Sequence, residues 1–534
     1  MFELFIRSII AVCFLAYVCI QGKHALHMFQ QNRYELQRYI PWLKTQFLQD
    51  RKSIYNVVIK EFLLLGLLIF SLLWHLHAWI LYVLYGIVFV TMFGLNIWQE
   101  RQERYIKPLH YTSRVIRQIV VMVLLNLLYA IFVLSLPVRI WGLFFIFGNM
   151  LQWLFVIVMH EITMPVETAV KRHYLNDAKR ILAQRTDLKI VGITGSFGKT
   201  SSKHILQEII SEEYYSLMTP ASFNTPMGIT ITIREQLKPI HEAFICEMGA
   251  DKVGEIDFLT KFVKPQFGVL TSIGPQHLQT FGSIENIIAE KFKIIENLPH
   301  DGVGFINYDN TYIRSYQITN PCTIITFAID HEDADFRAVN IVYSPNGSSF
   351  DVILPSKEIV SFQTRLLGKH NIMNILAAIA VGSYLGIEIS HLQQAVQRVQ
   401  YVEHRLEVKT EKGVTWIDNA FNSNPVGAQM SLEVMQRMPG RRYIITPGLI
   451  DLGEKQEEYN EAFGSQMLGN VDEVYLVGIQ QTKAIVEGLQ KSGFEMGNVH
   501  VFATIHEAYH QVRSRAQVGD TILLENDLPD AFNK

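Results

Sequence analysis

Residues 190–206 (IVGITGSFGKTSSKHIL) combine an apolar run, a glycine-rich turn and the start of a helical pattern. This order is typical of a loop that grips phosphate groups, in which Gly195 and Gly198 let backbone N–H groups face the ligand. Lys199 would then neutralise the terminal phosphates, and the hydroxyl of Thr200 would hold Mg²⁺. The loop is two residues shorter than the general G-x-x-x-x-G-K-[ST] pattern, counted back from Gly198 to Gly195. A strand before the loop and a helix after it favour a nucleotide site over a chance match.

A second set of charged residues follows this loop. Glu247 ends the apolar run 243–247, at the edge where an open α/β sheet presents its ligands. A carboxylate there would be a further ligand for Mg²⁺; the alternative is a strand-end glutamate that faces solvent. The stretch 277–293 offers His277 and, on a predicted helix, Lys291, which by themselves identify no chemistry.

The elements that position these residues begin after residue 187, where short apolar runs alternate with helical patterns. That alternation predicts mostly parallel sheets with crossover helices. Two sets of runs indicate two α/β domains, at 187–402 and 403–534, with the junction just before Glu403-His404-Arg405. The predicted strands are 189–193, 243–247, 267–271, 302–306 and 323–327, then 414–418, 442–446, 473–477 and 520–524.

Five apolar stretches precede these domains and predict an α-helical membrane region over residues 1–165. A helix needs roughly 20 mostly apolar residues to cross a bilayer, with about 17 as the lower limit. The second stretch is slightly short, so about five transmembrane helices is the best count. No small-residue cleavage site follows the first stretch, which favours a membrane anchor over a signal peptide. The stretches are 4–21, 61–76, 78–97, 118–136 and 139–160.

Basic residues gather in three loops, at 22–60, 98–117 and 171–185. Because basic loops stay on the cytoplasmic side of a membrane, an outside N-terminus and five spans satisfy all three. This orientation predicts a multi-pass protein of the cytoplasmic membrane whose α/β domains face the cytoplasm, where ATP is. The spans contain almost no charged residues, which argues against a transporter.

The composition excludes one class of partner. A net charge of -3 and a pI near 6.7 provide no basic face for nucleic acid. The four cysteines have no spacing typical of disulfides or of a metal site, which fits a reducing cytosol.

From about residue 188 to the C-terminus, the sequence resembles the Mur ligase family, most closely its branch that adds D-alanyl-D-alanine to a muramoyl tripeptide. No single motif is decisive, and the shared order of ten landmarks carries the resemblance. The landmarks are TGSFGKTS at 194–201, FNTPMG at 223–228, EMGADKVGEI at 247–256, HLQTFGS at 277–283, EK at 290–291, NYDN at 307–310, GKHNIMNILAA at 368–378, HRLE at 404–407, DNAFNSNP at 418–425 and GLIDLG at 448–453.

The resemblance implies an ATP-dependent ligase with a P-loop ATPase-like central domain and a Rossmann-like C-terminal domain. Such enzymes transfer the γ-phosphate of ATP to a carboxylate, and an amine then attacks the acyl phosphate to give an amide. Family likeness assigns one Mg²⁺ to Thr200 and Glu247 and another to His277. Lys291 matches a lysine that family members carry as a metal-binding carbamate; the alternative is an ordinary surface lysine.

Contacts to ATP are also implied. Asn224 matches an asparagine near the phosphates, and Asn374 matches one beside the adenine. In the family an arginine on the phosphates and an aspartate on the ribose reach across when the domains close, and Arg405 and Asp418 match them. The implied ATP-binding set is Gly195, Gly198, Lys199, Thr200, Ser201, Asn224, Asn374, Arg405 and Asp418, and the implied catalytic set is Lys199, Lys291 and His277.

Several positions depart from the family pattern. The stretch 418–421 (DNAF) keeps the first aspartate of an aromatic motif but lacks its second acidic residue and its tyrosine. Asp451 replaces a glutamate, and Tyr459 replaces a histidine. Glu525 and Asp527 stand where the family has a basic turn. If the basic turn holds a carboxylate, an acidic turn should repel one, because like charges repel. The acidic turn therefore predicts an amine whose far end is neutral or cationic; the alternative is that the turn faces solvent.

Membrane spans occupy the place of the uridine-nucleotide-binding domain of true muramoyl-peptide ligases. The sequence therefore predicts a membrane-anchored, ATP-dependent amide ligase that joins an amine donor to the carboxylate of a membrane-linked acceptor, such as a cell-envelope precursor. ATP, Mg²⁺ and the lipid bilayer are its expected partners. The alternatives are a poly-γ-glutamate-type capsule polymer synthase and a non-catalytic ATP-binding membrane scaffold.

Overall fold

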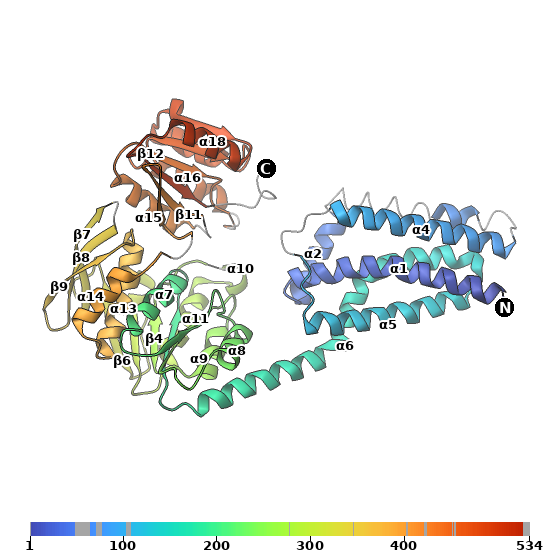
Figure 1. The fold of residues 1–534 in the computed structure, drawn as a ribbon, viewed down its shortest axis with the longest axis horizontal. Coiled ribbons are helices and arrows are strands. Elements are labelled where there is room, and N and C mark those ends of the chain that lie inside the picture. The colour runs from blue at the N-terminus through green and yellow to red at the C-terminus, as the bar shows by residue number, and fades with distance from the viewer. Residues whose placement is uncertain are drawn as a thin grey trace. The chain divides into compact units, whose positions relative to one another are not determined.

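The structure, a computed structural model, divides into two compact units, Met1–His173 and Tyr174–Lys534 (Figure 1). Four residues with predicted features, His277, Phe421, Asp451 and Asp527, lie outside the part of the chain that it describes. The described residues are 2–48, 65–70, 77–102, 108–276, 278–344, 347–401, 404–420, 424–450, 452 and 455–526.

The first unit is helical. Among the described residues, four helical stretches are long and apolar enough to cross a membrane, the last of which continues past the end of this unit: Arg7–Gln31, Ala78–Trp98, Ser113–Ser135 and Met150–Ala183. The predicted span at 61–76 lies mostly outside the described residues. The helices are α1 (Phe2–Gln31), α2 (Leu36–Leu48), α4 (Ala78–Gln102), α5 (Ser113–Ser135) and α6 (Trp141–Ala183).

Helix α6 extends past residue 165, where the sequence predicts the membrane region to end. It continues without a break to Ala183, with Pro165 inside it. Hydropathy depends on the surroundings of a helix and not on its backbone hydrogen bonds. The end of the apolar stretch therefore does not predict where the helix ends.

A nine-stranded sheet forms the first part of the second unit, in the order β2-β3-β1-β4-β5-β6-β7-β8-β9. Strands β2 to β7 pair in parallel and β7, β8 and β9 are antiparallel. Continuous apolar runs form β1 and β3 because both are buried, as expected for parallel strands covered on both faces. The strands are β1 (Lys189–Thr194), β2 (Ser216–Met218), β3 (Ala243–Glu247), β4 (Phe267–Leu270), β5 (Val303–Asn307), β6 (Thr323–Ala328), β7 (Phe336–Ser344), β8 (Gly347–Ile353) and β9 (Ile359–Thr364).

Helices cover both faces of this sheet and form two separate apolar cores. Side chains of α7, α13 and α14 pack with Val191 and Ile193 of β1. Those of α8, α9 and α11 pack with Ile190 of the same strand, because successive strand residues point to opposite faces. The helices are α7 (Lys199–Ile210), α8 (Pro226–Glu235), α9 (Glu255–Val263), α10 (Leu278–Phe281), α11 (Ile284–Glu296), α12 (Thr311–Arg314), α13 (Lys369–Tyr384) and α14 (Ile389–Arg398).

The C-terminal sheet has the order β10-β11-β15-β12-β13-β14, with only β10 antiparallel to its neighbour. The predicted fold class, a helical region followed by two α/β domains, is therefore confirmed. The elements are β10 (Glu407–Glu411), β11 (Val414–Asn419), α15 (Pro425–Gln436), β12 (Arg442–Thr446), α16 (Gln456–Gln466), β13 (Glu473–Val477), α17 (Lys483–Ser492), β14 (Val499–Phe502), α18 (Ile505–Arg515) and β15 (Thr521–Glu525).

Candidate functional site

The glycine-rich loop connects the end of β1 to the start of α7. Gly198 has a φ of 80°, and a Cβ there would lie 2.9 Å from Oδ1 of Asn374. A Cβ at Gly195 would lie 2.1 Å from Oγ1 of Thr271, so both positions require glycine. Lys199 folds back over the loop, and its Nζ donates to the carbonyl oxygen of Gly195 at 2.6 Å. Ser201 is buried in the first turn of α7, whose N-terminal N–H groups suit an anionic ligand.

Three of the predicted site residues meet at Glu247. This carboxylate ends β3, which pairs directly with β1, and it is 1% exposed. Its Oε1 accepts hydrogen bonds from Oγ1 of Thr200 at 3.3 Å and from Nδ2 of Asn224 at 3.1 Å. Hydroxyl and carboxylate oxygens are ligands that Mg²⁺ prefers, and Thr200 and Glu247 bring one of each together. The arrangement therefore fits a magnesium ion beside the phosphate loop.

Lys203, which sequence reasoning missed, is the cation beside this carboxylate. Its Nζ lies 3.0 Å from Oε2 of Glu247, and its side chain is 0% exposed. It also donates to the backbone carbonyl of Ala221. The only signal in the sequence was its position one helical turn after Lys199.

Replacing Lys203 with methionine is expected to lower the free energy of unfolding by about 3–5 kcal/mol, because Glu247 would be left buried and unpaired. Urea-dependent proteolysis of the full-length protein in detergent measures this loss. Lys261→Met is the matched control, since Lys261 is exposed and pairs with Asp257 in the preceding helical turn. A loss no larger than the control's would show that the buried pair contributes nothing to stability.

Lys291 lies buried on α11. Burial and, to a lesser extent, the nearby charge of Lys199 together lower the pKa of its ammonium group to about 7. A lysine amine must be neutral to react with CO₂, so this environment suits the predicted carbamate. His277, the other predicted metal ligand, lies outside the described residues, and its role stays a prediction.

Glu290 precedes Lys291 and has a separate task. Its carboxylate accepts hydrogen bonds from the backbone N–H groups of Gly254 at 2.8 Å and Ile256 at 2.5 Å, at the start of α9. A carboxylate also complements the positive end of a helix. Glu290 thus couples α11, which carries Lys291, to the loop that follows Glu247.

Glu290→Ala is expected to lower the free energy of unfolding by about 1–3 kcal/mol, because buried N–H groups lose a charged acceptor. The same proteolysis assay tests this, with Glu285→Ala as the control on the same helix. Equal stability of the two variants would contradict the capping role.

Asn374 and Arg405 lie close to the phosphate loop. Oδ1 of Asn374, on α13, accepts a hydrogen bond from Oγ of Ser202 at 3.0 Å and so braces the start of α7. Burial lowers the pKa of Arg405, and the charge of Glu247 opposes this effect. Their predicted contacts, to adenine and to the phosphates, stay predictions.

Asp418 stands at the end of β11. Its Oδ2 lies 2.8 Å from Nδ1 of His404, and its Oδ1 accepts from the backbone N–H of Ala420 at 3.1 Å. Glu407 is close enough for these three side chains to share a metal ion. However, Nζ of Lys409 lies 2.9 Å from Glu407 and 4.0 Å from Asp418, so a cation already compensates the carboxylates. The predicted ribose contact of Asp418 stays a prediction.

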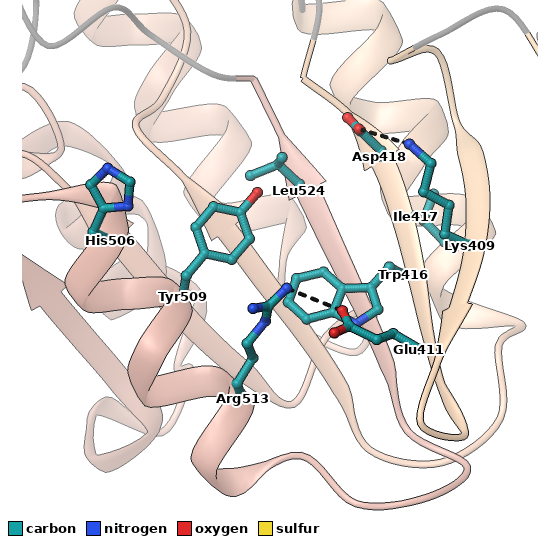
Figure 2. Close-up of a pocket in the computed structure, with 9 residues that line it drawn as sticks. All are labelled: Lys409, Glu411, Trp416, Ile417, Asp418, His506, Tyr509, Arg513 and Leu524. Atoms are coloured by element: carbon teal, nitrogen blue, oxygen red, sulfur yellow. Dashed lines mark hydrogen bonds and ion pairs between the residues drawn. The ribbon is translucent and has the colours of Figure 1, made fainter.

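An open cavity of about 370 Å³ extends from Asp418 along β10 and β11 (Figure 2). Trp416 and Tyr509 stack in it with ring centroids 5.7 Å apart, and the guanidinium of Arg513 lies 5.3 Å from the Trp416 centroid. Arg513 also donates to Glu411 at 3.1 Å. The cavity therefore presents an aromatic surface with paired charges beside the predicted ribose position.

Glu525 is not available to an incoming amine. It is buried at the end of β15, and both of its carboxylate oxygens accept hydrogen bonds from Nδ2 of Asn419, at 2.9 and 3.1 Å. Asp527 lies outside the described residues. The predicted charge effect on the amine therefore rests on Asp527 and not on Glu525.

The two α/β domains match two family models. The Mur ligase middle domain matches residues 193–382, and the Mur ligase glutamate ligase domain matches residues 404–525. The chain belongs to the Mur ligase family. The helical, apolar region that precedes these matches is not a Mur N-terminal domain.

Among its relatives, this Mur ligase is similar to the UDP-N-acetylmuramoyl-tripeptide--D-alanyl-D-alanine ligase of Bacillus subtilis, with 28% identity over 356 residues that cover 66% of this chain and 76% of the relative. The enzyme of the same name from Escherichia coli is 27% identical over 300 residues, which cover 56% of this chain and 66% of the relative. MurF from Acinetobacter baumannii shares the fold, with a TM-score of 0.60 at 23% identity, covering 67% of this chain and 77% of that structure. MurF from Thermotoga maritima in complex with ADP gives a TM-score of 0.60 at 23% identity, covering 68% and 81%.

These matches confirm the predicted enzyme class, an ATP-dependent ligase that forms amide bonds. The predicted use of ATP with Mg²⁺ is likewise confirmed for this Mur ligase.

Proposed function

We propose that this Mur ligase is anchored in the cytoplasmic membrane and joins an amine to a carboxylate of a membrane-linked cell-envelope precursor. One observation carries the proposal: a glycine-rich loop, beside which Thr200 and Asn224 donate to Glu247, follows four helices apolar enough to cross a membrane. A soluble acceptor needs no such helices. Helices that anchor the enzyme in the bilayer would keep the site near an acceptor that is held in the same bilayer.

The chemistry suits two successive transfers. A carboxylate oxygen of the acceptor forms a bond to the γ-phosphorus of ATP, the bond from that phosphorus to the bridging oxygen breaks, and ADP leaves. The amine nitrogen then bonds to the acyl carbon, the carbon–oxygen bond to the phosphate breaks, and the amine proton passes to solvent. Lys199 and the N-terminus of α7 stabilise charge on the transferring oxygens. Mg²⁺ on Thr200 and Glu247 would add positive charge at the same place.

The full-length protein in liposomes tests this function. ADP release should require both an amine and a lipid extract that contains envelope precursors, and mass spectrometry should find the amine on a lipid-linked product. Equal turnover of a soluble uridine-linked tripeptide would contradict the membrane acceptor. Growth of a polymer from one amino acid would instead support the poly-γ-glutamate alternative. ADP release that does not depend on any added amine would support the ATP-binding membrane scaffold.

A further inference from the structure

Charged side chains gather at one end of the helical unit, where α5 begins. Nε and Nη2 of Arg117 donate to the two carboxylate oxygens of Glu167 on α6, at 2.7 and 2.9 Å. The guanidinium of Arg114 lies 4.0 Å from the centroid of the Tyr34 ring, and its Nε lies 4.0 Å from Glu167. Two guanidinium groups of α5 thus lie beside the carboxylate of Glu167.

The end of α1 is fastened to the same place. Nε2 of Gln30 donates to the carbonyl oxygen of His110 at 2.9 Å, and the N–H of His110 donates to Oε1 of Gln30 at 3.0 Å. Phe29 packs edge-on against the ring of His160 on α6, with centroids 5.3 Å apart. Three helices and the turn after α1 therefore hold this group of side chains in place.

Several polar atoms in this group have no hydrogen-bond partner within the described residues. They are Nε of Arg114, Nδ1 of His160 and both amide atoms of Gln118, whose side chain is 0% exposed. Gln118 follows Arg114 by one helical turn, so the two lie on the same face of α5. Two turns further along, the buried amide of Asn126 is fully paired with Gln152, at 2.7 and 3.1 Å. An unpaired buried amide is costly, so the unpaired group points to a ligand from outside the chain.

Aromatic residues of the kind common at membrane–water interfaces gather at this end of the helices. Tyr39 and Trp42 of α2 stack on each other, and Trp42 packs against Trp153 of α6. Helix α2 carries apolar and basic residues around Pro41, as interfacial helices do. Arg33, Arg38 and Lys44 lie in the stretch 22–60, which the sequence predicts to be cytoplasmic.

We propose that Arg114, Gln118 and His160 form a binding site for the phosphate headgroup of a membrane lipid. A guanidinium group donates hydrogen bonds to phosphate oxygens with good geometry, and the Gln118 amide adds a further donor. Both donors would gain the partners that they lack. Lipid binding at this site stands alone, whereas its use to hold a lipid-linked acceptor rests on the proposed function.

Binding to the full-length protein in detergent, without ATP or amine, tests the site. The probe is geranylgeranyl diphosphate, compared with geranylgeraniol, which lacks the phosphates, and with inorganic pyrophosphate, which lacks the chain. The diphosphate lipid should bind at least about tenfold more tightly than either comparison compound. Arg114→Gln should weaken that binding about 10- to 100-fold and Gln118→Leu about tenfold, because each removes a donor to a charged group. Arg139→Gln is the matched control, since Arg139 is exposed at the other end of α5.

A second variant, Arg114→Lys, keeps the charge but loses the planar donor set, and it should bind between the parent and Arg114→Gln. Equal binding of the alcohol would overturn the proposal, as would parent-like binding by Arg114→Gln. Equal binding of pyrophosphate would assign the site to a soluble phosphate instead. Lipid binding without any lipid-linked product would leave this site intact and contradict the proposed function alone.

Discussion

Replacing Lys199 with alanine is expected to lower the rate of ADP release by about 100- to 1,000-fold, because the transferring phosphoryl group loses a positioned donor. Lys199 is the cation of the glycine-rich loop, and its Nζ rests on the carbonyl oxygens of Gly195 and Ser196 at 2.6 and 3.2 Å. Phosphate would displace those contacts without moving the backbone. Initial rates with a coupled assay for ADP, at saturating ATP and amine, measure the effect.

Lys261→Ala is the control for this experiment, since Lys261 lies exposed on α9 and pairs with Asp257 on the same helix. Its rate should stay within about twofold of the parent. Both variants should remain in the membrane fraction and unfold at the parent's urea concentration. A folded Lys199→Ala protein that keeps a tenth or more of the parent's activity would remove the loop from the catalytic site.

Lys291→Ala is expected to lower activity by about 100-fold or more, because a metal ligand that supplies several kcal/mol of charge stabilisation would be lost. The carbamate forms when the neutral amine bonds to the carbon of CO₂ and releases a proton. With a pKa of about 7, the amine is mostly neutral above pH 7 and mostly protonated below it. Incorporation of ¹³C-labelled CO₂ should therefore fall as the pH falls through 7, and activity in bicarbonate-free buffer should fall with it.

The neighbouring Lys293 on the same helix provides the control, and Lys293→Ala should keep near-normal activity and the same dependence on bicarbonate. Added acetate should partly restore Lys291→Ala by supplying a carboxylate in place of the carbamate. If removing bicarbonate leaves the parent's rate unchanged across this pH range, Lys291 acts as a plain lysine and the carbamate hypothesis is wrong.

Much of the fold followed from local patterns in the sequence. The runs 189–193 and 243–247 became β1 and β3, because a strand buried on both faces must be apolar throughout. The phosphate loop was recognisable because Gly198 and Lys199 act within one turn. Residues that are neighbours in the sequence are then also neighbours in the folded site. Order along the chain likewise carried the family resemblance, which the match at 193–382 confirmed.

Packing decided what the sequence left open. Lys203 pairs with Glu247, 44 residues apart in number, only because α7 and β3 lie side by side. Asn374 reaches Ser202 across 172 residues because α13 packs against α7, and Glu525 turns inward because Asn419 lies on the adjacent strand. Periodicity and composition describe the surroundings of a residue averaged over one turn or strand. They do not state which distant side chain fills the neighbouring space, and burial then sets charge and pKa through that neighbour. The sequence by itself therefore determined the class of fold and of reaction, whereas only the tertiary structure decided which groups are paired, which are buried and which lack a partner.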